Sequence, residues 1–228
     1  SIEKIDFNSF VDYLIISELS KDVDAYRVSV FFHKDSEDKN GKLKMGPIWD
    51  YNLSFGNVDF CKSSSVSGWV FEEETACHTS IPRFWYDLLQ NDSFREKLIL
   101  RWSELRQSVL SFDNIFNYID SIGESLNDAQ HRNFERWNIM GEWVWPNYQL
   151  GLTYRDELGF LKYWIYNRVH WIEQNLYNLN LLFPDCLSDE KELIQITNEL
   201  GRSDDGENGK FLFYIYDNGC VEKKVVIY

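Results

Sequence analysis

Two carboxylates flank a predicted β-hairpin near the start of the chain, in positions that suit metal-assisted chemistry. The sequence predicts strands over residues 25–34 and 41–49, joined by an Asn-Gly turn. Asp24 precedes the first strand and Asp50 follows the second. Because antiparallel pairing places the start of one strand beside the end of the other, we expect both carboxylates to lie together, with Asn52 beside them. Such carboxylates, with Asn52 as a further metal ligand, suit a divalent cation and a phosphate group, although Asp also often serves only as a turn cap.

The elements predicted around this hairpin are mostly helices. Apolar residues at helical spacing predict a helix over residues 6–20, and Glu18 falls on its apolar face. A capping box at residues 93–96 predicts the start of a second helix, and another pattern follows Asp113. A second capping box, at residues 153–156, precedes a long helical pattern. The predicted fold class is therefore α+β and mostly α-helical.

Two stretches lie outside this helical pattern. Residues 57–80 show no periodicity and are predicted to form a long loop, which is usually functional or covered by a partner. After a short predicted helix near 189–200, residues 210–228 are expected to form a second hairpin. The sequence thus predicts a main domain over 1–185 and, over 186–228, an appendage or the start of a following domain.

Composition and charge exclude some classes of partner. The 228 residues are 44% hydrophobic and 17% aromatic, with nine Trp, so the chain can bury a sizeable core. The net charge of -14 disfavours binding to nucleic acid or to an anionic membrane surface. No run reaches the roughly 18 apolar residues of a membrane span, so none is predicted.

Other side chains are candidate binding groups. Arg132 and Arg136 share one predicted helix face, where they would dock an anion or substrate, clamp the hairpin, or only join a network of ion pairs and stacked rings. The aromatic residues of 141–148 suit stacking on a sugar or simply packing in the core. The four His lack any paired spacing, and the four Cys lack a C-x-x-C motif, so neither predicts a metal site. Either four buried thiols or one or two disulfides in an exported protein fits the cysteines.

The hairpin region resembles a known family. Its sequence, ELSKDVDAYRVSVFFHKDSEDKNGKLKMGPIWDYNLSFGN, is similar to the signature of the spore-coat protein H (CotH) kinase-like family. The later segments IPRFWYDLL, AQHRNFERW and LKYWIYNRVHWI resemble the bacterial branch of that family. This resemblance covers roughly residues 5–180 and implies an atypical protein-kinase-like fold. It also implies transfer of the ATP γ-phosphate, with Mg²⁺ (or Mn²⁺), to Ser or Thr of a secreted, coat or surface protein.

The resemblance implies roles for individual residues. Asp24 corresponds to the family's catalytic-loop aspartate and Asp50 to its metal-binding aspartate. Ser29 stands where many members have Asn, which weakens a second metal position although a hydroxyl can still bind a cation. Asp22 competes with Asp24 for the catalytic role, because the KDVD register could slip by two. We also expect Asp50 to project into the nucleotide site because its aromatic neighbours, Trp49 and Tyr51, anchor the backbone in the core.

The same resemblance carries expectations about the whole protein. No Gly-rich phosphate loop precedes the hairpin, so we expect this chain to be the C-lobe, the N-lobe to come before it, and no nucleotide to bind the chain alone. Extracellular or cell-surface localisation is implied. A disulfide between Cys61 and Cys77 would pin a segment placed like an activation loop. The alternative function is a catalytically silent coat or adhesion module that binds a protein or glycan, and nucleotide binding discriminates the two.

Overall fold

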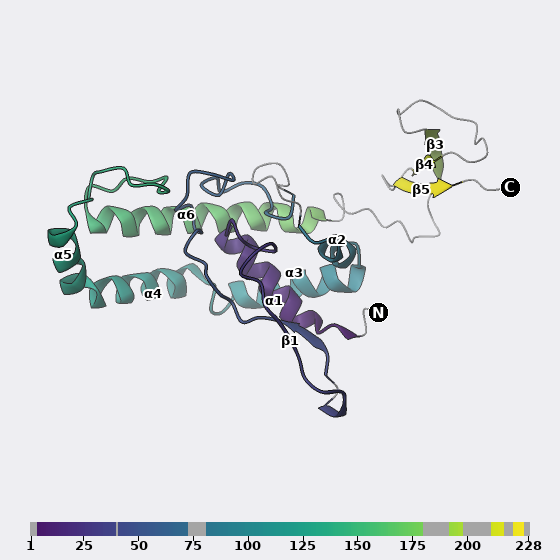
Figure 1. Cartoon of the computed structure of the whole chain (residues 1–228), viewed down its shortest axis with the longest axis horizontal. Helices are drawn as coiled ribbons and strands as arrows, with labels where there is room; N and C mark the ends of the chain where they lie inside the picture. Colours follow the sequence, from purple (N-terminus) through teal and green to yellow (C-terminus); the bar gives the residue numbers. More distant parts are fainter. Residues whose placement is uncertain are drawn as a thin grey trace.

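The computed structural model confirms an α+β fold that is mostly helical. The hairpin and the helices occupy the first 179 residues, and a small sheet follows (Figure 1). Among the described helices, none is both long and apolar enough to cross a lipid bilayer. The structure describes residues 4–39, 41–72, 81–179, 192–197, 211–216 and 221–225.

The first helix, α1 (Phe7–Ser20), forms where the apolar spacing predicts it. The Asp6 side chain caps its start by accepting a hydrogen bond from the Ser9 amide at 3.2 Å. Its buried face carries both apolar residues and Glu18. The helix ends at Lys21, which adopts a left-handed conformation.

Five further α-helices follow among the described residues, and their ends refine the sequence predictions. The predicted box at residues 93–96 does not start α3, because the Asn91 side chain is the N-cap and accepts from the Phe94 amide. The single pattern after Asp113 is divided at Leu126 into two helices. The capping box at residues 153–156 is confirmed. The bounds are α2 (Phe84–Leu89), α3 (Asp92–Arg106), α4 (Phe112–Ser125), α5 (Asn127–Arg136) and α6 (Tyr154–Asn175), with short 3₁₀ helices η2 (Glu37–Lys39) and η3 (Leu176–Asn178).

The helices pack around α1, which lies at the centre of the molecule (Figure 1). Helices α3 and α6 contact α1, and α4 lies alongside α6. Helix α5 turns the chain at the far end of α4. Much of the core is aromatic: Tyr13 and Tyr26 both contact the Trp85 ring, whose side chain is fully buried. Burying each such side chain stabilises the fold by roughly 1.5–3 kcal/mol.

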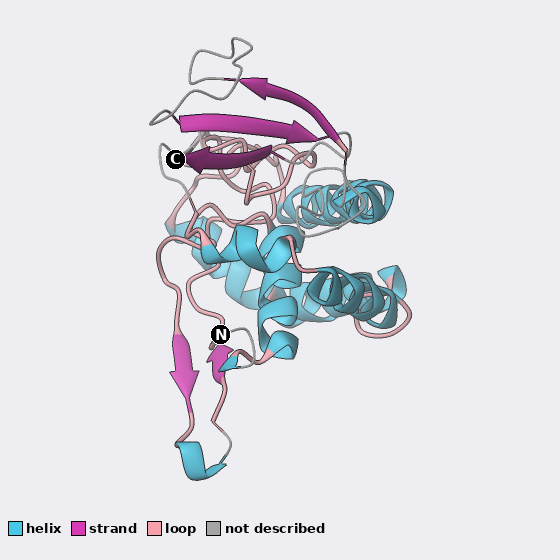
Figure 2. Ribbon diagram, turned by 90° about the vertical axis from the view of Figure 1, so that its right-hand side faces the viewer, coloured by secondary structure: helices cyan, strands magenta, loops and turns pink. Residues whose placement is uncertain are grey.

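The predicted hairpin is present but shorter than expected. Strands β1 (Phe32–Lys34) and β2 (Leu43–Met45) pair antiparallel, with Phe32 opposite Met45. The hairpin extends away from the helices (Figure 2). Residues 25–31 are not a strand, because Tyr26 and Ser29 have positive φ and the Val28 amide folds back onto the Asp24 carbonyl at 3.1 Å. The chain entering β1 is therefore a compact turn.

The C-terminal residues form a three-stranded antiparallel sheet in the order β3-β4-β5. Strands β4 (Phe211–Tyr216) and β5 (Val221–Val225) form the predicted hairpin. The helix predicted near 189–200 is wrong where the structure describes it. Residues Leu193–Thr197 form strand β3 instead, and their run of apolar and β-branched side chains suits pairing with β4. The predicted domain boundary near 185 lies outside the described residues and stays a prediction.

Candidate functional site

The candidate site begins where α1 ends. Residues 22–28 form a turn, and the chain around Asp50 lies against it through two main-chain hydrogen bonds. The Val23 amide donates to the Leu53 carbonyl at 3.2 Å, and the Phe55 amide donates to the Ser20 carbonyl at 2.6 Å. These bonds fix the turn and the segment after β2 to one another. They bring together two parts of the chain that the sequence separates by the whole hairpin.

Asp24 lies in this turn and is half-buried. Its amide donates to Asp22 Oδ2 at 3.1 Å, and its carbonyl accepts from the Arg27 and Val28 amides. Burial raises the pKa of the Asp24 carboxyl above its usual value, and the nearby Asp50 carboxylate raises it further, while Arg27 opposes the shift. Asp24 and Asp50 are therefore close enough to repel one another.

Asp50 faces the same region from the other side of the hairpin ends. Its side chain is exposed, and its φ of 66° lies in the left-handed region, which Asp tolerates better than β-branched residues do. The Ser29 hydroxyl donates to Asp50 Oδ2 at 3.3 Å. The structure therefore groups Asp24, Asp50 and Ser29, which the sequence predicted as one site.

Asp22 lies behind this group and is only 2% exposed. Its Oδ2 holds the Asp24 amide, whereas its Oδ1 is buried without a hydrogen-bond partner in the described part of the chain. Burial, followed by the charges of Asp24 and Asp50, raises the pKa of Asp22 to about 7. Because an acceptor hydroxyl must reach the catalytic base, the more accessible Asp24 suits that role better than Asp22 does.

Asn52 has a different setting from the one predicted. Its exposed side chain lines a cleft of about 320 Å³ between the segment after Asp50 and α6. Its carbonyl accepts from the Asn57 side chain at 3.4 Å. Trp49 also departs from the prediction, because its side chain is 61% exposed and packs edge-on against Phe31 rather than in the core. Tyr51 does anchor the backbone, through a 3.0 Å hydrogen bond between its hydroxyl and that of Ser17.

The donor set was tested against the requirements of a divalent cation. Within the described ranges, no group of three or more His, Cys, Asp or Glu side chains could hold a metal ion. A cage made of protein ligands alone is thus not present there. Asp50 and the Ser29 hydroxyl, with the Asp24 charge nearby, instead fit Mg²⁺, which is usually bound by one or two carboxylates and completed by waters and substrate phosphates. The unpaired Asp22 oxygen and the mutual repulsion of the carboxylates are features that a cation would relieve.

The two predicted arginines are not part of this group. Arg132 and Arg136 are exposed on α5, which lies at the far end of the helical layer from the hairpin (Figure 1). Arg136 lies over the Trp137 ring at 5.3 Å, so one predicted stacking contact is present. Among the described residues, no contact connects these arginines to the hairpin.

The structure describes only one of the two cysteines in the predicted disulfide. Cys61 is disulfide-bonded, whereas Cys77 lies outside the described residues. The pairing of Cys61 with Cys77 therefore stays a prediction. No regular element interrupts residues 57–72, in agreement with the predicted loop.

Two buried charged residues near the site, Lys21 and Arg168, were missed by the sequence interpretation, which placed Glu18 on an apolar helix face but gave it no partner. Glu18, Lys21 and Arg168 are each at most 2% exposed, and they connect α1 and α6 to the loop that follows Asp50. A signal existed, because Glu18 and Arg168 both fall on the apolar faces of their helices. A charged residue on such a face requires a partner inside the protein.

Comparison with known proteins gives a family match. Neither a search of curated proteins nor a search of solved structures gave a significant match. The family model described as CotH kinase protein matches residues 2–172, which include α1, the hairpin, the grouped carboxylates and nearly all of α6. Since this match covers well over half of the sequence, the chain belongs to the CotH kinase protein family.

Proposed function

We propose that Asp24 and Asp50 form the phosphoryl-transfer site of a protein kinase of the CotH type. The proposed reaction moves the γ-phosphoryl group of ATP to a Ser or Thr hydroxyl of a partner protein. The observation that carries the proposal is the convergence of the turn that holds Asp24 with the segment that holds Asp50. Main-chain hydrogen bonds join the two segments, the Ser29 hydroxyl donates to Asp50, and the two carboxylate charges interact. Family membership supports the reaction class.

Asp24 is proposed as the general base. The hydroxyl proton of the acceptor passes to the Asp24 carboxylate as the acceptor oxygen forms its bond to the γ-phosphorus. The bond between that phosphorus and the bridging oxygen breaks, and ADP leaves with the electron pair. Burial raises the pKa of the Asp24 carboxyl above its usual value, which makes Asp24 a better proton acceptor than an ordinary aspartate.

Asp50 is proposed to hold the cation, with the Ser29 hydroxyl beside it. A bound Mg²⁺ or Mn²⁺ supplies positive charge that offsets the charge of the β- and γ-phosphates. Ser29 orients the Asp50 carboxylate through its 3.3 Å hydrogen bond. Asp22 fixes the Asp24 amide at 3.1 Å, so that the base keeps its position relative to Asp50.

The proposal extends to the rest of the protein. A nucleotide-binding N-lobe is expected ahead of this chain, because phosphoryl transfer depends on positioning of the phosphates by a phosphate loop and a lysine. The 228-residue chain alone is then expected to bind ATP-Mg²⁺ poorly and to transfer no phosphate. The acceptor is proposed to be a coat or surface protein outside the cell.

One observation favours the alternative of a binding module. Trp143 and Trp145 are 59% and 66% exposed, on the loop that joins α5 to α6. The Trp143 indole donates to the Asn147 carbonyl at 3.0 Å, and the Trp145 ring stacks on Phe60, so both rings are held in place while exposed. Such rings suit contact with a protein or glycan. This function requires neither Asp24 nor Asp50.

A radiolabelled-ATP assay tests the proposal. The samples are the 228-residue chain, the same chain with its upstream sequence, and the longer protein carrying Asp50→Ala, Asp24→Asn or, as a control at the hairpin tip, Asp38→Asn. The longer protein and its control are expected to transfer phosphate, and the two site variants to lose transfer by on the order of 10³-fold. Equal transfer by wild type and Asp50→Ala would remove Asp50 from the mechanism. No transfer by any sample would favour the binding module.

A further inference from the structure

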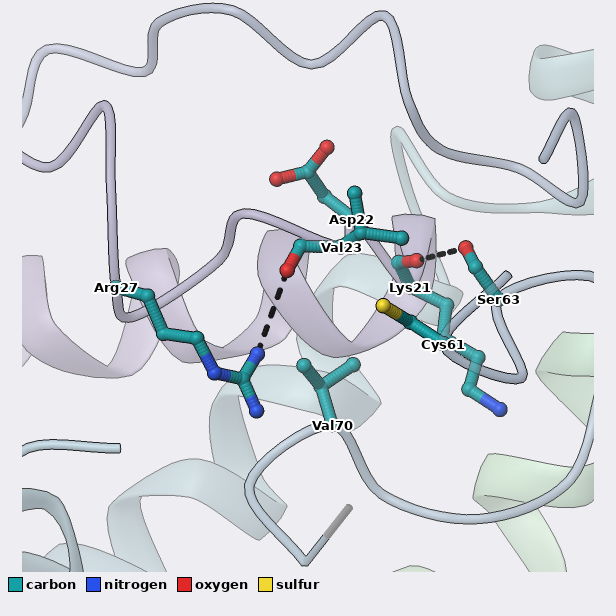
Figure 3. A pocket seen from close by; sticks show the side chains of 7 residues that line it. All are labelled: Lys21, Asp22, Val23, Arg27, Cys61, Ser63 and Val70. Carbon is teal, nitrogen blue, oxygen red and sulfur yellow. Dashed lines mark hydrogen bonds between the residues drawn. The ribbon is translucent and has the colours of Figure 1, made fainter. Parts of the chain in front are cut away.

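Lys21 is an almost fully buried lysine at the junction of α1 and the catalytic turn. It is 1% exposed and lines a small pocket with Cys61, Ser63 and Val70 (Figure 3). Figure 3 shows its side chain and the Asp22 carboxylate pointing in different directions. The proposed mechanism assigns no task to this lysine, which directly precedes the site.

The ammonium group of Lys21 is directed into the loop that follows Asp50. It donates to the carbonyls of Lys62 at 2.9 Å, Ser65 at 3.1 Å and Ser67 at 2.6 Å. Residues 62–67 belong to no helix or sheet, so their carbonyls depend on such donors. The three N–H groups of a lysine match three carbonyl acceptors in number.

The main chain of Lys21 is also hydrogen-bonded to this loop. The Ser63 hydroxyl donates to the Lys21 carbonyl at 2.6 Å (Figure 3). Ser63 is 1% exposed. Lys21 has a φ of 50°, so it is the point at which the chain leaves the helix and enters the turn that carries Asp24. Both the side chain and the backbone of one residue therefore fasten this turn to residues 62–67.

We infer that Lys21 is a positioning residue for Asp24 and acts through the loop over residues 62–67. The ammonium is buried against main-chain carbonyls, so it does not reach a nucleotide or an acceptor. It sets the start of the turn in which Asp24 lies three residues later. Loss of its hydrogen bonds would remove the Lys21 donor from the Ser65 and Ser67 carbonyls and free the turn to shift relative to Asp50. This inference rests on the proposed function only for its catalytic consequence.

The variants Lys21→Met and Ser63→Ala test the inference. Arg95→Met serves as a matched control, because Arg95 is also buried, on α3, and donates to a main-chain carbonyl, that of Leu89, at 2.7 Å. Amide hydrogen exchange of the 228-residue chain is measured by mass spectrometry. Wild type and variants are compared under conditions in which they have the same free energy of unfolding. Exchange over residues 22–28 is expected to rise in both test variants, more so in Lys21→Met, and to stay at the wild-type level in the control.

Kinetics of the longer protein supply the second readout. Lys21→Met is expected to lower kcat by on the order of 10²-fold with little change in KM for ATP, because a displaced base slows chemistry more than binding. Ser63→Ala should lower kcat less, and Arg95→Met should leave it unchanged. Unchanged exchange over 22–28 in both test variants, or equal kcat in Lys21→Met and Arg95→Met, would overturn the inference. If Asp50→Ala leaves transfer intact, the proposed function fails, whereas the exchange data still decide whether Lys21 orders the turn.

Discussion

Glu18 and Asp22 are both 2% exposed and lie four residues apart, yet their surroundings differ. Glu18 accepts hydrogen bonds from the Val70 amide at 2.8 Å and the Tyr26 hydroxyl at 2.9 Å, and it forms an ion pair with the buried Arg168 at 3.3 Å. Burial raises the pKa of Glu18, whereas Arg168 and these hydrogen bonds oppose the shift. A cation of the protein itself compensates this carboxylate.

Asp22 has no comparable compensation among the described residues. One of its oxygens is unpaired, and its charged neighbours, Asp24 and Asp50, are of the same sign. Glu18 and Asp22 therefore represent two different roles of a buried carboxylate. Glu18 and Arg168 join α1, α6 and the loop over residues 66–71, while Asp22 belongs to the group of carboxylates for which we propose an external cation. Three changes test this distinction.

The largest effect on stability is expected from Arg168→Met. This change would leave the Glu18 carboxylate buried without its cation and would remove the donor to the Val66 and Gly68 carbonyls. Removing one partner of a buried pair typically lowers the free energy of unfolding by about 3–5 kcal/mol. Urea unfolding followed by Trp fluorescence measures this loss in the free energy of unfolding. Lys162→Met, which removes an exposed pair with Asp120, is the control and should cost about 1 kcal/mol or less. Equal losses in the two variants would contradict the distinction.

For Asp22→Asn we expect an increase in the free energy of unfolding, in contrast to the decrease expected for Arg168→Met. In the unfolded chain the Asp22 carboxyl has a pKa near its ordinary 3.8, whereas in the fold it is about 7. The folded state then binds this proton more tightly, so wild-type stability falls as the pH rises from about 4 to 7 and is level above that.

The Asp22→Asn variant lacks this titration. It should therefore gain on the order of 1–3 kcal/mol over wild type at pH 8 and little at pH 4. Unfolding free energies measured across this pH range, with Asp38→Asn as the exposed control, test the prediction. A less stable Asp22→Asn variant at pH 8 would show that the Asp22 charge is compensated in the fold.

The smallest effect is expected at Ser29. An Asn side chain offers a carbonyl oxygen, which is a better ligand for a hard cation than a hydroxyl. With ATP present, Ser29→Asn in the longer protein should bind Mn²⁺ about fivefold more tightly, or roughly 1 kcal/mol. Ser29→Ala, which removes the 3.3 Å bond to Asp50, should bind more weakly than wild type. Equal Mn²⁺ affinities in the two variants would place Ser29 outside the cation site.

Much of the helical framework could be predicted from local sequence patterns. The apolar spacing located α1, and the Thr153 capping box located the start of α6, because both signals act within a few residues. The division at Leu126 was missed because apolar spacing continues across it. Strand β3 was predicted as a helix because its pairing with β4 is a contact distant in sequence.

The candidate site was also predicted only in part, because some of its contacts are distant in sequence. Asp24 and Asp50 were identified from hairpin geometry and family resemblance, but the turn over residues 22–28 was predicted as strand because its positive φ values have no glycine to signal them. Lys21 was overlooked within a run of charged residues. Its burial depends on a loop more than 40 residues away, which no local pattern reports.

The central claim is that Asp50 and its neighbours form a cation site shared with a nucleotide. The most direct measurement is a Mn²⁺ titration followed by electron paramagnetic resonance, with ATP present, on the protein with its upstream sequence. Wild type and the Asp38→Asn control should bind Mn²⁺ with the same dissociation constant. Asp50→Asn should raise that constant by roughly tenfold or more, because a charged ligand is lost. An unchanged dissociation constant in Asp50→Asn would contradict the account.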